Sequence, residues 1–329
     1  MPKIKVTEKI FYNLYHEFTN HVFFKKFFPS PELHFSSKSF SLVYHYTSLT
    51  ALISIIEDQC LWATNAFFLN DKSEFKHGVN IVKETLDSIT NEESQNILKA
   101  IGTQIEEVFN AEKYVTCFSK KGDLLSQWKS YGNNGTGVSI GFFPHKLISS
   151  LLGSISGKDI IYDRKKQDNS IIAIINEAVE FFKPKLNEFE WQDGQYLKAV
   201  GAIVVQLLQN FITGYKDPAF EEEQEYRIEF DSNKNLKNSM DKNFKIFFRA
   251  NEKLIIPYTK IYTKSKEHSN NKAQDNEAIN QTITKLPIEE IIIGPSPNQD
   301  DIINGLQKLL KENLYLSVKI IKSKVPYRS

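Results

Sequence analysis

The chain has 329 residues, with 41 Lys and Arg, 40 Asp and Glu, and a formal net charge of +1. Apolar residues make up 41% of it and charged residues 25%, which excludes wholesale disorder and supports a sizeable core. A charge so close to zero argues against a protein that coats nucleic acid or an anionic membrane electrostatically. Two cysteines, Cys60 and Cys117, are too few for a disulfide framework, so we expect a cytoplasmic protein.

The first 39 residues predict an accessory segment. Apolar residues at helical spacing indicate a helix within 8–28, and the proline- and serine-rich stretch 29–41 indicates a connector. We expect the Phe-rich end of this helix to pack on the core or on a second copy of the chain, which would form a homo-oligomer. Its phenylalanines are Phe23, Phe24, Phe27 and Phe28. The most apolar stretch, 199–214, is shorter than the ~20 residues of a membrane span, so no membrane partner is expected.

The next hundred residues alternate short strands and helices. Ser48 is a plausible N-cap for the helix that follows the first strand. The pattern predicts strands at 42–46, 61–63, 114–118 and 138–142, helices from 49, within 72–110 and at 124–131, and a turn at 132–137.

The rest of the chain is mostly helical first and mostly extended later. We predict helices over 165–213 with a break at Pro184, strands at 225–230, 244–248 and 254–262, a polar surface loop at 264–280, and a final strand, helix and strand. This irregular alternation favours a mixed α+β fold over a doubly wound sheet. The expected organisation is one domain over 40–329, with helical insertions at about 72–110 and 165–213.

Two common kinds of site are absent from the pattern. Gly132, Gly135 and Gly137 follow a predicted helix and precede a strand, the reverse of a dinucleotide-binding loop, so we interpret them as a tight turn. No two of the seven histidines lie four residues apart, and neither cysteine has a nearby Cys or His partner. No metal site is therefore expected.

His45 lies in the first predicted strand, directly before Tyr46. On a strand, His45 and Thr47 face the same side, beside the start of the next helix. This pair could hold a ligand through hydrogen bonds. The alternative is a core histidine held by a backbone partner.

The acidic run that ends in Arg227 is the second unusual feature. On the predicted strand, Glu223, Glu225 and Arg227 share one face. Two carboxylates and a guanidinium can hold a sugar hydroxyl and stabilise a developing positive charge. The alternative is an edge strand with an Arg–Glu pair.

Two further groups are weaker candidates. Asp71 and Glu74 are adjacent to Asn70 at a helix start, where capping is the simplest role. Trp128 and Tyr131 are helical neighbours that could stack on a ligand ring or on core residues.

A set of short motifs in a fixed order makes the chain resemble the bacterial domain-of-unknown-function family 2971. They are HYTS at 45–48, LND with Glu74, CFS at 117–119, Trp128 with Tyr131, GVSIGF at 137–142, EQEYR at 223–227, IIPY at 255–258, IEEIIIGP at 288–295 and SKVPYR at 323–328. The resemblance covers about residues 40–328.

That family is more remotely similar to ADP-ribosyltransferases of the toxin and phage-defence type. The resemblance implies a split β-sheet core and NAD as substrate, with an acceptor that is a protein or a nucleic acid. It implies catalytic roles for Glu225, Glu223 and His45. NAD would be held by His45, Tyr46, Thr47 and Arg227, with Ser119, Trp128 or Tyr131 as the third active-site residue.

The chemistry of NAD cleavage agrees with these residues. Breaking the nicotinamide–ribose bond passes through an oxocarbenium-like centre, which a nearby carboxylate stabilises. The sequence thus predicts an ADP-ribosyltransferase, or an NAD glycohydrolase if water is the acceptor. Two alternatives stay open: a non-enzymatic module that binds a nucleotide or a protein, and a nuclease with a metal held by Asp71, Glu74 and Glu225.

Overall fold

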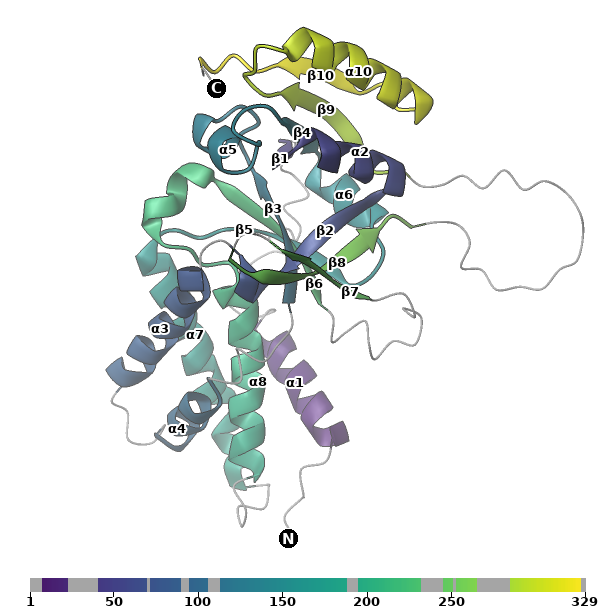
Figure 1. The fold of residues 1–329 in the computed structure, drawn as a ribbon. Coiled ribbons are helices and arrows are strands. Elements are labelled where there is room, and N and C mark those ends of the chain that lie inside the picture. The colour runs from purple at the N-terminus through teal and green to yellow at the C-terminus, as the bar shows by residue number, and fades with distance from the viewer. Residues whose placement is uncertain are drawn as a thin grey trace, which may run out of the picture. The chain divides into compact units, whose positions relative to one another are not determined.

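The computed structural model describes most of the chain in nine segments. They are residues 8–22, 41–69, 72–89, 95–105, 113–187, 195–231, 245–250, 253–264 and 285–326. Figure 1 shows its helices and strands. The fold is mixed α+β, as predicted. None of the described helices is both long enough and apolar enough to cross a membrane. The predicted loop at 264–280 and the phenylalanines from Phe23 to Phe28 lie outside the described residues, apart from Lys264.

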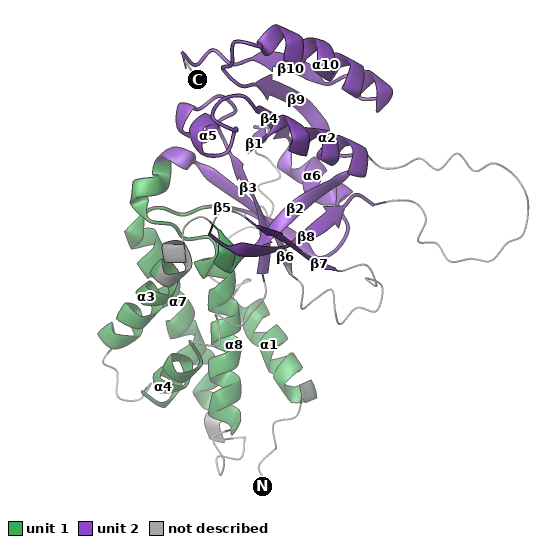
Figure 2. Ribbon diagram, in the orientation of Figure 1, with its two compact units in different colours: residues 1–34, 66–111, 160–221 green, residues 35–65, 112–159, 222–329 purple. Residues whose placement is uncertain are grey.

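The chain divides into two compact units, coloured separately in Figure 2. The first unit comprises residues 1–34, 66–111 and 160–221, and the second comprises the rest. Both stretches predicted as helical insertions, 72–110 and 165–213, therefore fall within the first unit, together with the N-terminal helix.

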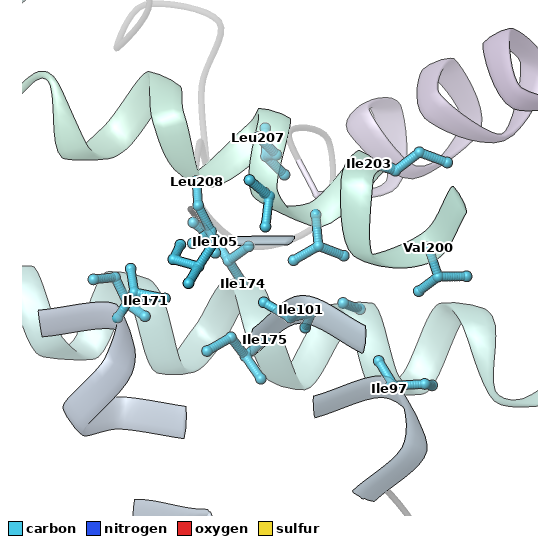
Figure 3. Close-up of a cluster of buried hydrophobic side chains, with 14 of the residues drawn as sticks. Ile97, Ile101, Ile105, Ile171, Ile174, Ile175, Val200, Ile203, Leu207 and Leu208 are labelled. Atoms are coloured by element: carbon cyan, nitrogen blue, oxygen red, sulfur yellow. The ribbon is translucent and has the colours of Figure 1, made fainter. Parts of the chain in front are cut away.

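The first unit is helical. Its helices are α1 (Glu8–Val22), α3 (Lys72–Ser88), α4 (Gln95–Gln104), α7 (Arg164–Phe182) and α8 (Gln195–Ile212). The side chains between them form one apolar cluster, part of which appears in Figure 3. Phe18 of α1 is fully buried in this cluster, against Phe181 and Phe182. The N-terminal helix thus packs on the helices of its own unit.

The second unit holds a ten-stranded sheet. Its strands are β1 (Val43–Thr47), β2 (Cys60–Asn65), β3 (Lys113–Ser119), β4 (Val138–Phe142), β5 (Ile155–Asp159), β6 (Glu225–Asp231), β7 (Ile246–Ala250), β8 (Ile255–Tyr262), β9 (Ile288–Ile293) and β10 (Lys319–Lys322). The order is β10-β9-β4-β1-β3-β2-β8-β7, with β6 and β5 added at β3. Among the strands that the structure describes, only β9 and β10 pair in parallel.

Three helices cover one face of this sheet. They are α2 (Leu49–Asp58), α6 (Pro144–Ser150) and α10 (Gln299–Glu312). Their buried residues join Phe118 and Ile228 of the sheet in a second apolar cluster. We call this side the helix-covered face and the other side the second face. Ser48 caps α2 as predicted, since its Oγ accepts a hydrogen bond from the Ala51 N–H at 3.2 Å.

The sequence missed α6 and β5. The helix is only seven residues long and begins with Pro144, which suits a first helical turn but gives no periodic signal. The strand reads ISGKD and pairs with β6 through its whole length. Gly157 suits this place because a Cβ there would clash with the Tyr226 hydroxyl. Neither segment carries a local pattern strong enough to predict it.

The turn at 132–137 forms as predicted, with Gly135 at a φ of 82°. The Gly294 N–H donates to the Gly137 carbonyl at 2.9 Å, and a Cβ on Gly294 would clash with the Gly135 carbonyl. The glycines of GVSIGF and IIIGP therefore allow two backbone segments to approach closely.

Candidate functional site

The sheet splits at β3. One edge of β3 pairs with β6 from Lys113 to Ser119. The other edge pairs with β2 at residues 114–115 and with β1 at Ser119 alone, so β1 and β2 diverge beside residues 116–118. We call this place the split.

The His45 side chain lies at the split. Its Nδ1 lies 3.0 Å from the Cys117 carbonyl oxygen, and its ring centroid lies 5.6 Å from that of Phe118. Because a carbonyl oxygen only accepts, Nδ1 must carry the proton. Nε2 then offers a lone pair, and no described residue donates to it. The sequence raised the alternative of a histidine held by a backbone partner. This is correct for Nδ1, which bonds to the Cys117 carbonyl, and does not account for Nε2.

Burial lowers the pKa of His45, since it removes water from the charged form. The hydrogen bond to Cys117 opposes this shift, and the positive charge of Arg249 adds to it. At neutral pH the imidazole is thus an uncharged group with one free acceptor.

We expect acid to destabilise the wild-type protein more than His45→Asn. The unfolded histidine takes up a proton below its usual pKa of about 6.5, whereas the folded one resists protonation. The stability contributed by His45 is complete above that value and falls as the pH drops toward the lowered folded pKa. The Asn amide can donate to Cys117 but does not titrate. Melting temperatures from pH 8 to pH 5 measure the difference, and parallel curves for both proteins would contradict this assignment.

Glu225 and Arg227 form a bidentate ion pair on β6. Arg227 Nε lies 2.6 Å from Oε1 of Glu225, and Nη2 lies 2.9 Å from Oε2. The two residues are only 5% and 4% exposed. The predicted strand face is thus present for this pair, but the strand is an interior one, because β6 pairs with both β3 and β5. The alternative raised from the sequence is therefore correct for the Arg–Glu pair and wrong for the edge strand.

Glu223 does not share that face. It ends a 3-10 helix over Pro218–Glu223, and Gln224 turns the chain with a φ of 43° before β6 begins. The backbone carbonyl of Glu223 accepts a hydrogen bond from Ser119 Oγ at 2.8 Å. The prediction that Glu223 lies on the strand with Glu225 is wrong because the positive φ breaks the alternation.

Ser119 links the end of β3 to the residue before the turn into β6 through its hydrogen bond to the Glu223 carbonyl. Its Oγ also accepts from the Lys121 N–H at 3.1 Å, and the residue is 2% exposed. Ser119 pairs with Glu225 in register, and on its other side with Tyr44. Register partners point to the same face, so Tyr44, Ser119 and Glu225 lie on the second face. His45 and Thr47 belong to the helix-covered face.

Tyr46 and Trp128 pack together and support the fold. Their rings meet edge to face at 4.8 Å, and Trp128 is fully buried. The Tyr46 hydroxyl donates to the Lys121 carbonyl at 2.7 Å and accepts from the Leu124 N–H at 3.0 Å. Neither ring presents a face to a ligand here. Tyr131 ends α5 (Leu125–Ser130) and is 39% exposed.

Asp123 connects this cluster to the C-terminal motif. One oxygen, Oδ1, accepts from Trp128 Nε1 at 2.7 Å and from Ser323 Oγ. The other, Oδ2, accepts from the Lys324 N–H at 2.8 Å. The first two residues of the SKVPYR motif, Ser323 and Lys324, are thus held to the loop before α5.

We predict that Asp123→Ala lowers the free energy of unfolding by about 2–3 kcal/mol, because it leaves the buried Trp128 indole without its acceptor. Thermal or urea unfolding measures the change. Asp300→Ala is the control, since Asp300 forms an exposed pair with Lys322 and its loss costs about 1 kcal/mol at most. Equal effects of the two changes would show that Asp123 has no special structural role.

Metal ligation finds little support in the described residues. They contain no group of three or more His, Cys, Asp or Glu side chains that could hold a metal ion. Asn70 and Asp71, as well as the side chain of Glu74, lie outside what the structure describes. The nuclease alternative therefore stays a prediction.

Residues 127–228 match the model of a family described as Protein of unknown function (DUF2971). The match covers less than half of the chain, from α5 to β6. It includes the Glu225–Arg227 pair but not His45. This supports the resemblance to that family drawn from the motifs. Comparison with curated proteins and with solved structures found no match for the chain.

Sequence reasoning missed one residue that acts on His45. Arg249 of β7 lies close enough to His45 to lower its pKa, and it donates to Thr64 Oγ1 at 2.9 Å. The only signal in the sequence is that Arg249 follows two phenylalanines in a strand. Such a pattern is too common to single out a functional residue.

Proposed function

We propose that this chain cleaves the nicotinamide–ribose bond of NAD and transfers ADP-ribose to an acceptor or to water. The main support is the order of three neighbouring strands. Ser119 of β3 pairs with Glu225 of β6 on one side and with Tyr44, the neighbour of His45, on the other. We also propose that the sheet is of the ADP-ribosyltransferase type, which has a split β-sheet core. The divergence of β1 and β2 beside β3 supports this part of the proposal.

Each residue has a role that its chemistry allows. The neutral His45 can accept a hydrogen bond at Nε2 from a ribose hydroxyl. When the C1′–N bond breaks, its electron pair leaves with nicotinamide and positive charge develops on the ribose. The Glu225 carboxylate stabilises that charge. The acceptor, or water, then adds to C1′ and loses a proton. Arg227, which is 4% exposed, fixes the carboxylate plane.

The proposal makes one geometric demand. Since His45 and Glu225 project from opposite faces, the proposal requires NAD to bind at the split and to reach both faces of the sheet. Trp128 is too deeply buried to stack on nicotinamide in this conformation, so Tyr131 is the better candidate of the two.

The test is nicotinamide release by the purified protein. The protein is incubated with NAD labelled in its adenylate phosphate, with and without bacterial lysate, and products are separated into protein, nucleic acid and small molecules. Release without transfer identifies a glycohydrolase. Label in a polymer identifies a transferase, in keeping with a toxin or anti-phage role. No release under either condition would overturn the proposal and favour a binding module.

A further inference from the structure

Three adjacent strands place aromatic rings and cations together on the second face. Register pairs Trp62 of β2 with Lys260 of β8, and Tyr258 of β8 with Phe247 of β7. The Trp62 and Tyr258 rings stack at 4.4 Å, and the Phe247 and Tyr258 rings at 5.6 Å. We call this group, with Lys245, Arg249 and Lys260, the aromatic–cation lattice.

The cations lie over the rings. The Arg249 guanidinium is 5.9 Å from the Tyr258 centroid, and Lys245 Nζ is 5.3 Å from that of Phe247. Lys260 Nζ lies 5.9 Å from the Trp62 centroid and 5.8 Å from that of Phe247. Lys260 bonds to Asp58, whereas the described residues provide no carboxylate for Lys245 or Arg249.

A purely structural role does not account for this arrangement. Stacked rings on neighbouring strands do stabilise a sheet, but like charges placed together there destabilise it. An anion that binds the lattice would offset this repulsion. Trp62 is also 37% exposed, and Lys245 and Arg249 are both exposed. The lattice therefore offers a planar ring and positive charge to the same ligand.

We propose that the aromatic–cation lattice binds single-stranded nucleic acid. Unpaired bases stack on aromatic side chains while lysine and arginine neutralise the phosphates. Duplex bases cannot present their faces in this way, and an acidic peptide has carboxylates but no ring that must stack. The near-zero net charge of the chain argues against electrostatic coating of nucleic acid but does not exclude a local basic face. The proposal does not depend on NAD cleavage.

Fluorescence anisotropy with fluorescein-labelled 12-mers of oligo(dT) and oligo(rU) tests the proposal on the full chain. We expect the protein to bind at least one of the two oligonucleotides. Its affinity should fall as the salt concentration rises from 50 to about 200 mM. Trp62→Ala should weaken binding about tenfold, whereas Trp62→Phe keeps a ring and should retain most of the affinity. Lys245→Glu should also weaken binding. Tyr12→Ala and Lys308→Ala, an exposed aromatic and an exposed lysine elsewhere, should bind as the wild type does.

Several results would overturn the proposal. They are no binding of either 12-mer at 50 mM salt, unchanged affinity of a folded Trp62→Ala variant, or equal competition by duplex DNA or polyglutamate. Circular dichroism checks folding. If Trp62→Ala does not fold, Lys245→Glu decides, because it leaves every ring in place, and unchanged affinity in that variant excludes the lattice.

Discussion

Glu225→Gln is expected to reduce nicotinamide release by about 10²–10³-fold, the usual effect of removing one preorganised electrostatic contact. Gln has nearly the same shape as Glu and can still accept one hydrogen bond from Arg227, but it leaves the buried guanidinium without its counter-charge. Turnover is therefore compared only after circular dichroism shows that the variant is folded. The negative charge opposite the developing oxocarbenium centre is lost. The reduction should appear in kcat rather than in KM, because that charge develops only toward the transition state. Steady-state release of nicotinamide over a range of NAD concentrations measures both constants.

Two neighbouring glutamates provide matched controls. Glu222 is exposed and bonds to Ser126, so Glu222→Gln should leave turnover unchanged. Glu223→Gln should be mild for hydrolysis and more severe for transfer, if Glu223 serves the acceptor. Turnover of Glu225→Gln equal to that of the wild type would remove this glutamate from the mechanism. A general loss in all three variants would indicate damage to the fold instead.

Arg227→Ala is expected to destabilise the protein by about 3–5 kcal/mol, the usual cost of breaking a buried ion pair by removing one partner. The change leaves the Glu225 carboxylate without its bidentate partner in a place that is 5% exposed. A loss of this size approaches the whole stability of a typical domain. We expect circular dichroism at 37 °C to show partial or complete unfolding, with a much lower urea midpoint.

An exposed arginine and a double substitution test the cause. Arg164 bonds to Glu84 and Asp168 at the surface, so Arg164→Ala should cost about 1 kcal/mol or less. Replacing both partners, as in Glu225→Leu with Arg227→Met, should recover much of the stability, because no buried charge remains unpaired. If the double substitution is as unstable as Arg227→Ala, lost packing rather than the lone carboxylate is the cause.

Local patterns predicted most elements because their signals lie within a few residues. The Ser48 cap and the apolar stripe of α2 are examples, since capping and helical periodicity depend on near neighbours only. The predicted bounds of the strands β1, β3, β4 and β6 lie within one residue of those in the structure. The short helix α6 and the polar strand β5 were missed for the same reason, since their stability comes from packing rather than from their own sequence.

The sequence by itself determined the mixed α+β class, the lack of a metal-binding spacing pattern and the candidate residues of β1 and β6. The tertiary structure alone decided what those residues contact. It brought the Cys117 carbonyl to His45, 72 positions away, and Asp123 to Ser323, 200 positions away. It also turned Glu223 off the strand and buried Trp128. Strand pairing and register depend on which distant segments share a sheet, and local propensity does not encode that choice.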